Sequence, residues 1–121
     1  MSKFLLRETA SGVKFDLMAT NGQIILTSEV YTSRAAAVKG IQCIRLNAPN
    51  AKLENQTEEG WKTLTNPKFE LYLDRAGQYR FRLKARNGKI VGISEGYASK
   101  AGCMNGIESV KKNAALAEME E

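Results

Sequence analysis

The sequence predicts an α+β protein in which two tandem repeats share one antiparallel sheet, with both helices on one face of it. Three observations lead to this fold class. The chain matches itself, because residues 15–22 (FDLMATNG) align with residues 81–88 (FRLKARNG). Apolar and basic residues alternate over residues 79–86, which is the period of a half-buried strand. Small and apolar residues then recur at helical spacing after residue 33 and again after residue 99.

The self-match also defines the organisation of the chain. It continues without a gap over five further pairs: Ser28-Glu29 with Ser94-Glu95, Tyr31 with Tyr97, Ser33 with Ser99, Gly40-Ile41 with Gly106-Ile107, and Asn47-Ala48 with Asn113-Ala114. The length of 121 residues suits one domain. We therefore expect a single domain, residues 1–121, made of repeat 1 (3–55), a connector (56–67) and repeat 2 (68–120). We also expect a monomer, a pseudo-dimer within one chain with pseudo-twofold symmetry.

Each repeat is expected to open with three strands joined by tight turns. In repeat 2 these strands cover residues 68–73, 79–86 and 89–94. Asn21-Gly22 and Asn87-Gly88 separate the second strand from the third, and Asn-Gly favours the type I′ turn of two-residue hairpins. These four residues are assigned a structural role.

A helix follows the third strand in each repeat. Ser33 and Ser99 are the expected N-caps, because a serine hydroxyl can accept a hydrogen bond from an N–H group of the first turn. The core-facing stripes are Ala37, Ile41, Ile44 and Ala48 in repeat 1, and Cys103, Ile107, Val110 and Ala114 in repeat 2. Gly40 and Gly106 lie mid-helix, where glycine costs up to ~1 kcal/mol relative to alanine. Their recurrence predicts close packing of helix on sheet.

Residues 51–55 are expected to form a short fourth strand after the first helix, and residues 116–120 a weaker one after the second. Trp61 is the only tryptophan and lies in the polar connector. It could cover one end of the shared core or anchor a partner.

The motif Phe-x-Leu-x-Ala-x-Asn-Gly, followed by Ser-Glu-x-Tyr-x-Ser and then Gly-Ile, occurs twice. This combination resembles the YegP-like family, a bacterial domain of unknown function, and residues 77–88 and 94–97 of repeat 2 are especially similar. The resemblance implies tandem three-strand-plus-helix units in one antiparallel sheet, with the strand after each helix exchanged onto the other unit. Repeat 1 departs from the pattern at Val30, where a glycine is expected. The family supplies no catalytic residues.

Composition narrows the classes of function. The chain has no histidine, and Cys43 and Cys103 lack any metal-ligand spacing, so we expect no metal site and no cofactor. No apolar run approaches the ~20 residues that span a bilayer. The first twelve residues lack the apolar segment of a signal peptide. We therefore expect a cytoplasmic protein with no membrane partner and with both cysteines as free thiols.

The repeated Ser-Glu pairs are the candidates for catalysis. A serine nucleophile needs a positioned base, and no histidine is available. Glu29 and Glu95 could meet across the pseudo-twofold axis as an acid/base pair, which would make the chain a small enzyme. Alternatively, each carboxylate accepts from helix N-terminal amides or pairs with an arginine. Without a supported nucleophile or cofactor loop, we predict a non-enzyme with no catalytic residues.

Positive charge gathers in repeat 2 and gives the main functional candidate. The formal net charge is +5, and residues 68–112 contain 10 Lys/Arg against 4 Asp/Glu. Side chains two apart on a strand share a face, so a row of cations is expected there. This candidate basic surface comprises Arg80, Arg82, Lys84, Arg86 and Lys89, with Tyr72 on the neighbouring strand.

The candidate basic surface has three interpretations. It could bind an acidic protein, or it could bind RNA or DNA, with Tyr72 stacking on a base. It could also be a solvated outer face balanced by Glu70, Asp74 and Glu95. The aligned positions of repeat 1 hold Lys14, Asp16, Met18 and Thr20, so the fold alone does not require the row. We predict a non-enzymatic interaction module that uses this surface.

Overall fold

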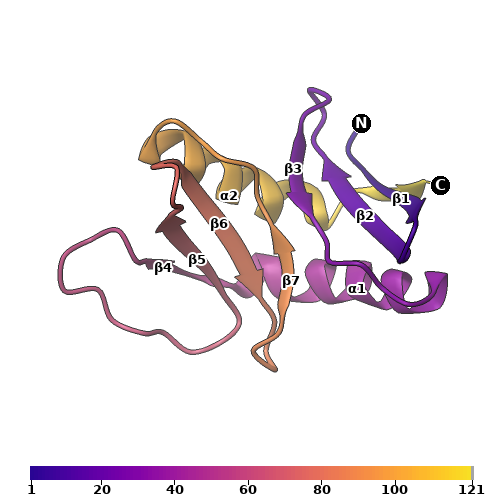
Figure 1. The fold of residues 1–121 in the computed structure, drawn as a ribbon, viewed down its shortest axis with the longest axis horizontal. Helices are drawn as coiled ribbons and strands as arrows, with labels where there is room; N and C mark the ends of the chain where they lie inside the picture. The colour runs from indigo at the N-terminus through magenta and orange to yellow at the C-terminus, as the bar shows by residue number, and fades with distance from the viewer. Residues whose placement is uncertain (121) are drawn as a thin grey trace.

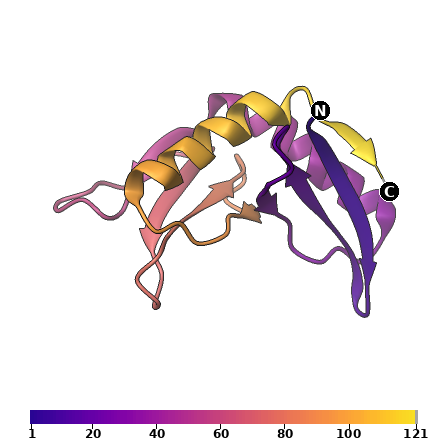
Figure 2. The same ribbon diagram turned by 90° about the horizontal axis from the view of Figure 1, so that it is seen from above.

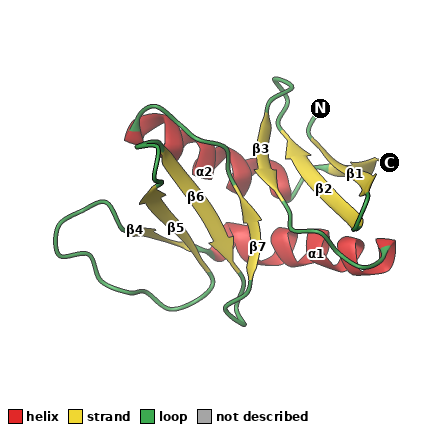
Figure 3. Ribbon diagram, in the orientation of Figure 1, coloured by secondary structure: helices red, strands yellow, loops and turns green. Residues whose placement is uncertain are grey.

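The computed structural model describes residues 1–120, and its two repeats have the same element order (Figure 1). Repeat 1 contains β1 (Lys3–Thr9), β2 (Gly12–Met18), β3 (Ile24–Thr27), α1 (Arg34–Asn47), the 3-10 turn η1 (Ala48–Asn50) and β4 (Lys52–Asn55). Repeat 2 contains β5 (Lys68–Leu73), β6 (Tyr79–Lys84), β7 (Ile90–Ile93), α2 (Lys100–Ala114) and β8 (Glu118–Glu120). Both helices cover the same face of the sheet (Figures 2 and 3).

The eight strands form one sheet in the order β4-β5-β6-β7-β3-β2-β1-β8. The strand after each helix therefore joins the other repeat, since β4 pairs with β5 and β8 pairs with β1. These two outer pairs are parallel, whereas the six inner strands pair antiparallel. The sheet is thus mixed, and the antiparallel expectation holds for its six inner strands only. The pairing at the two edges of the sheet is parallel because the chain leaving each helix crosses to the other repeat before it joins the sheet.

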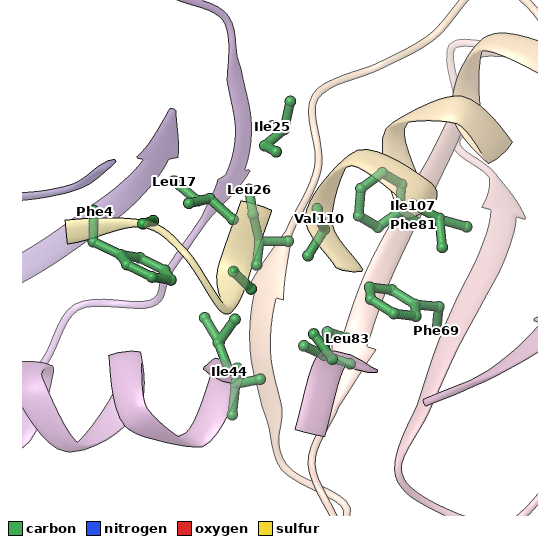
Figure 4. Packing of buried hydrophobic residues seen from close by; sticks show 14 of the residues in the cluster. Phe4, Leu17, Ile25, Leu26, Ile44, Phe69, Phe81, Leu83, Ile107 and Val110 are labelled. Atoms are coloured by element: carbon green, nitrogen blue, oxygen red, sulfur yellow. The ribbon is translucent and has the colours of Figure 1, made fainter. Parts of the chain in front are cut away.

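The two halves of the sheet meet at the β3–β7 pair, through the bridge between Thr27 and Ile93. These two residues are equivalent in the internal alignment, so the pseudo-twofold axis passes through this bridge. Buried residues of both repeats form one hydrophobic cluster under the helices, including Phe4 and Phe15 from repeat 1 and Phe69 and Phe81 from repeat 2 (Figure 4).

The Asn-Gly hairpins differ from the predicted type I′ turn. Only glycines have positive φ among residues 1–120, including Gly22 (85°) and Gly88 (85°), so neither asparagine adopts the left-handed conformation that type I′ requires. The N–H of Gly22 donates to the carbonyl of Ala19, and Ala19 N–H donates to Gln23. This is a three-residue loop, a turn followed by a left-handed glycine. Gly88 closes the same loop in repeat 2.

The helices begin and pack as predicted. Ser33 Oγ accepts from Ala36 N–H at 3.1 Å, and Ser99 Oγ accepts from Gly102 N–H at 3.0 Å. Both apolar stripes are buried. A Cβ atom at Gly40 would overlap the Tyr31 hydroxyl, and one at Gly106 would overlap the Tyr97 hydroxyl. The mid-helix glycines are therefore explained by close packing, with a tyrosine from the loop before each helix as the neighbour.

Candidate functional site

Three cations of the candidate basic surface lie on β6, and two lie beyond it. Arg80, Arg82 and Lys84 alternate with the buried Phe81 and Leu83, so they point away from the helices. Strand β6 ends at Lys84. The strand predicted over residues 79–86 is therefore two residues shorter, and it carries three cations in a row, without Arg86.

The remaining two cations lie on either side of the Asn87-Gly88 turn. Arg86 is exposed in the turn, and its backbone N–H donates to Oδ1 of Asn47 at 3.2 Å. Lys89 is exposed just before β7.

A single carboxylate, that of Glu70 on β5, serves three cations. Its Oε1 accepts from Nε of Arg82 at 2.5 Å, and its Oε2 lies 3.3 Å from Nζ of Lys84 and 3.2 Å from Nζ of Lys68. Register explains the first contact, because Glu70 and Arg82 are direct cross-strand partners. Glu70 is buried on the outer face of repeat 2, and its carboxylate is the negative group on which these three cations converge.

Lys68 links this centre to a second buried carboxylate, Glu54 on β4. Lys68 Nζ lies 2.7 Å from Oε1 of Glu54, which also accepts from Leu64 N–H at 2.6 Å. Gln56 donates to the other carboxylate oxygen at 2.7 Å. Sequence reasoning missed this pair, because Glu54 comes from the other repeat and only the exchanged strand brings it to Lys68.

The pKa values of both carboxylates reflect these contacts. Burial by itself would raise the pKa of Glu54, but the hydrogen bond from Lys68, with those from Gln56 and Leu64, lowers it to about 2. Burial would also raise the pKa of Glu70, and the hydrogen bonds from Arg82 and Lys68 outweigh it and lower that pKa. Both groups are therefore ionised at neutral pH.

Arg80 and Tyr72 complete the surface. Nε of Arg80 lies 2.7 Å from Oδ2 of Asp74, and its Nη1 donates to the carbonyl of Ser94 at 3.0 Å. The hydrogen bond from Arg80 lowers the pKa of Asp74. The guanidinium of Arg82 lies 4.4 Å from the centre of the Tyr72 ring, in a cation–π contact. One face of the only aromatic ring of this surface is thus covered by an arginine.

The surface retains positive charge after this pairing. Four cations, Lys68, Arg80, Arg82 and Lys84, share three carboxylates, those of Glu54, Glu70 and Asp74. Among residues 1–120, Arg86 and Lys89 have no ion pair, so they add two unpaired charges. Glu70 and Asp74 thus balance the row as the solvated-face interpretation expects. Glu95 does not, because its side chain pairs with no residue of this range.

The serine hydroxyls of the two Ser-Glu pairs form hydrogen bonds with backbone groups. Ser28 Oγ accepts from Phe15 N–H at 2.9 Å and donates to the carbonyl of Glu29 at 2.8 Å. Ser94 makes the same two bonds with Phe81 and Glu95. Both serines are buried, and both glutamates are exposed. Within residues 1–120 neither glutamate side chain accepts from a helix amide or pairs with an arginine, so that expectation is wrong and the serines carry the structural role.

The remaining sequence candidates show no reactive environment. Burial raises the pKa of Cys103 to about 11 and also raises that of Cys43, which disfavours the reactive thiolate. Within the described residues no group of three His, Cys, Asp or Glu side chains could hold a metal ion. Trp61 is 44% exposed and lies outside the core cluster, beside Leu64 in the connector. Neither described helix is long and apolar enough to cross a membrane.

Comparisons with known proteins agree with the duplicated fold. Residues 9–54 and 74–121 each match the family model DUF1508, described as a domain of unknown function. The chain is 41% identical over 109 residues to the UPF0339 protein YegP of Escherichia coli O157:H7, covering 90% of this chain and 86% of that protein. It is also 64% identical over 47 residues to a UPF0339 protein of Methanosarcina acetivorans, covering 39% of this chain and 81% of that protein.

Two solution NMR structures share the fold. The protein of unknown function yegP from E. coli matches with a TM-score of 0.80 and 33% identity, over 98% of this chain and 90% of that one. A UPF0339 protein from Shewanella oneidensis matches with a TM-score of 0.80 and 30% identity, over 98% and 89%. The chain therefore belongs to the YegP-like UPF0339 family of tandem DUF1508 repeats, whose function is unknown.

Proposed function

We propose that the chain is a non-enzymatic interaction protein that binds an acidic protein segment through the candidate basic surface of repeat 2. The observation that carries the proposal is the sharing of Glu70 by Lys68, Arg82 and Lys84. Three cations and only two carboxylates, Glu70 and Glu54, meet in this network. A carboxylate of the partner would form an ion pair with Lys84, whose contact with Glu70 is the longest of the three cation contacts of that carboxylate.

The internal duplication supports a function specific to repeat 2. In repeat 1, Asp16 takes the position of Arg82 and pairs with Arg7 at 3.0 Å. Leu5 takes the position of Glu70, opposite Asp16. The same strand pair is thus stable without a shared carboxylate or a row of cations, so the excess charge of repeat 2 is not a requirement of the fold.

An acidic protein is favoured over nucleic acid by the position of Tyr72. Sequence-tolerant binding of single strands uses aromatic side chains as stacking platforms. One face of Tyr72 is occupied by Arg82, and Tyr72 is the only aromatic residue of the surface. The non-enzymatic assignment is supported by the two buried serines and by the raised pKa values of both cysteines.

The test is fluorescence anisotropy with a labelled glutamate-rich peptide at about 50 mM salt, where charge contacts are only weakly screened. Lys84→Glu and Arg86→Glu should each weaken binding about tenfold, the effect of losing ~1.4 kcal/mol. Lys14→Glu, the matched control on the same face of repeat 1, should change affinity less than about twofold. Equal losses from all three variants would mean a general charge effect and would overturn the proposal. Absence of peptide binding would do the same, as would tighter binding of a thymidine oligonucleotide.

A further inference from the structure

A groove of about 750 Å³ opens between the β2–β3 hairpin and α2. Three parts of the chain line it: the hairpin tip from Ala19 to Asn21, the first two residues, and one side of α2 from Asn105 to Asn113 together with Leu116 just after the helix. Figure 2 shows the N-terminus beside the last turn of α2, where these parts converge. The volume lies within the ~300–1,000 Å³ that is usual for small-molecule sites.

The hairpin of repeat 2 is tied to α1, the helix of repeat 1, by a hydrogen bond that has no counterpart between the hairpin of repeat 1 and α2 among residues 1–120. In this bond the N–H of Arg86 donates to Oδ1 of Asn47. The residues aligned with Arg86 and Asn47 are Thr20 in the hairpin of repeat 1 and Asn113 in α2, and both line the groove. Within residues 1–120 no hydrogen bond joins Thr20 to Asn113, although the Asn113 amide donates to Ser109 just as the Asn47 amide donates to Cys43. The hairpin tip of repeat 1 is thus not fastened to α2.

Opposite charges line this groove one helical turn apart. Glu108 and Lys112 are both exposed and both lie on the groove side of α2. They form no ion pair with each other or with any other described residue, although a glutamate four residues before a lysine is well placed for one. The aligned residues of α1 are Gln42 and Leu46, so the fold does not require this pair of charges.

Part of the groove lining is apolar. Met1 is 86% exposed and Leu116 is 74% exposed, and both residues line the groove. The groove therefore combines a negative group, a positive group and an apolar surface. A ligand complementary to it carries an ammonium, a carboxylate and an apolar side chain.

We propose that this groove binds a free amino acid with an apolar side chain. The ammonium group of the ligand donates to the Glu108 carboxylate, and the carboxylate of the ligand accepts from the Lys112 ammonium group. Hydrogen bonds between charged groups are about twice as strong as neutral ones, so these two contacts set the orientation. The side chain of the ligand lies against Met1 and Leu116. The site is independent of the basic surface of repeat 2, and neither proposal rests on the other.

The test is titration of the full chain with L-leucine, followed by the backbone amide signals in ¹H–¹⁵N NMR spectra. We expect saturable shifts at Thr20, Asn21 and Ser109, with a dissociation constant of about 1 mM or below. Leucinamide lacks the carboxylate and N-acetyl-leucine lacks the ammonium group, so each should bind about tenfold more weakly.

Two charge-neutralising variants and one control complete the test. Glu108→Gln and Lys112→Gln should each weaken leucine binding about tenfold, and both positions are exposed, so the fold is retained. Lys39→Gln, at the α1 position aligned with Asn105, should leave affinity unchanged. Absence of saturable shifts overturns the proposal, as does equal binding of leucine and its two capped derivatives. Loss of binding in the Lys39 control to the same extent would also overturn it.

Discussion

Nζ of Lys68 lies 2.7 Å from Oε1 of Glu54, and the two residues come from different repeats. Both side chains are almost fully buried, on the sheet face opposite the helices. The pair joins the exchanged strand β4 to β5, where Glu54 stands beside Glu70. A buried ion pair is costly to form and more costly to break, because the remaining charge is then buried alone.

The first prediction concerns acid stability. Glu54 has a folded-state pKa of about 2 against an ordinary value of 4.5, so the unfolded chain takes up the proton first as pH falls. Its contribution to stability is present above about pH 4.5 and is lost as pH decreases towards 2, an effect on the order of 3 kcal/mol. Glu70 acts in the same direction, because its pKa is also lowered. Urea unfolding at a series of pH values measures this, and Glu54→Gln should flatten the acid limb. An identical acid limb in both proteins would contradict it.

The second prediction compares a buried lysine with its exposed equivalent. Lys68→Ala leaves Glu54 and Glu70 without their shared cation and should reduce the free energy of unfolding by ~3–5 kcal/mol. Lys3 occupies the equivalent edge pair, 3.1 Å from Glu120, with both side chains more than a third exposed. Lys3→Ala should therefore cost at most ~1 kcal/mol. Similar losses in the two variants, measured by denaturant unfolding, would show that burial of the Lys68 pair is not what stabilises β4.

The third prediction concerns the separate repeats. In the intact chain β4 completes the sheet of repeat 2, and β8 completes that of repeat 1. Residues 1–60 alone therefore lack the edge strand next to β1, and their fourth strand has no partner. We expect this fragment to show no cooperative melt as a monomer, and to fold only by dimerising or when mixed with residues 61–121. Size-exclusion chromatography with thermal unfolding tests this, and a cooperative monomeric melt would show that strand exchange is dispensable.

Local patterns and the internal repeat predicted most of the fold. The serine caps and the two apolar stripes follow from spacing within a single element, and the structure confirms them. The turn type could not be predicted in this way. Asn-Gly suits both the two-residue type I′ loop and the three-residue loop with a left-handed glycine, and the flanking strands decide between them.

The candidate site was harder to predict because the register of the strands decides which charged side chains contact one another. The alternation on β6 identifies Arg82 and Lys84, but only the pairing with β5 places Glu70 opposite Arg82. Glu54 reaches the site through an exchanged strand, so no local pattern reveals it. The groove beside Glu108 has the same origin, because it forms between a hairpin of repeat 1 and the helix of repeat 2.

The fourth prediction concerns Gly40 in the middle of α1. In an ordinary helix, glycine to alanine stabilises by up to ~1 kcal/mol. Here the added Cβ would overlap the Tyr31 hydroxyl and lie only 2.7 Å from Cζ of the same ring and 3.2 Å from the Phe15 ring. Overpacking of this kind costs ~1–3 kcal/mol, so we expect Gly40→Ala to lower the free energy of unfolding. Adding Tyr31→Phe removes the nearest atom and should recover part of the loss, which denaturant unfolding of the single and double variants measures. If Gly40→Ala instead raised stability, helix propensity would outweigh packing here, and the recurrence of glycine at Gly106 would need another cause.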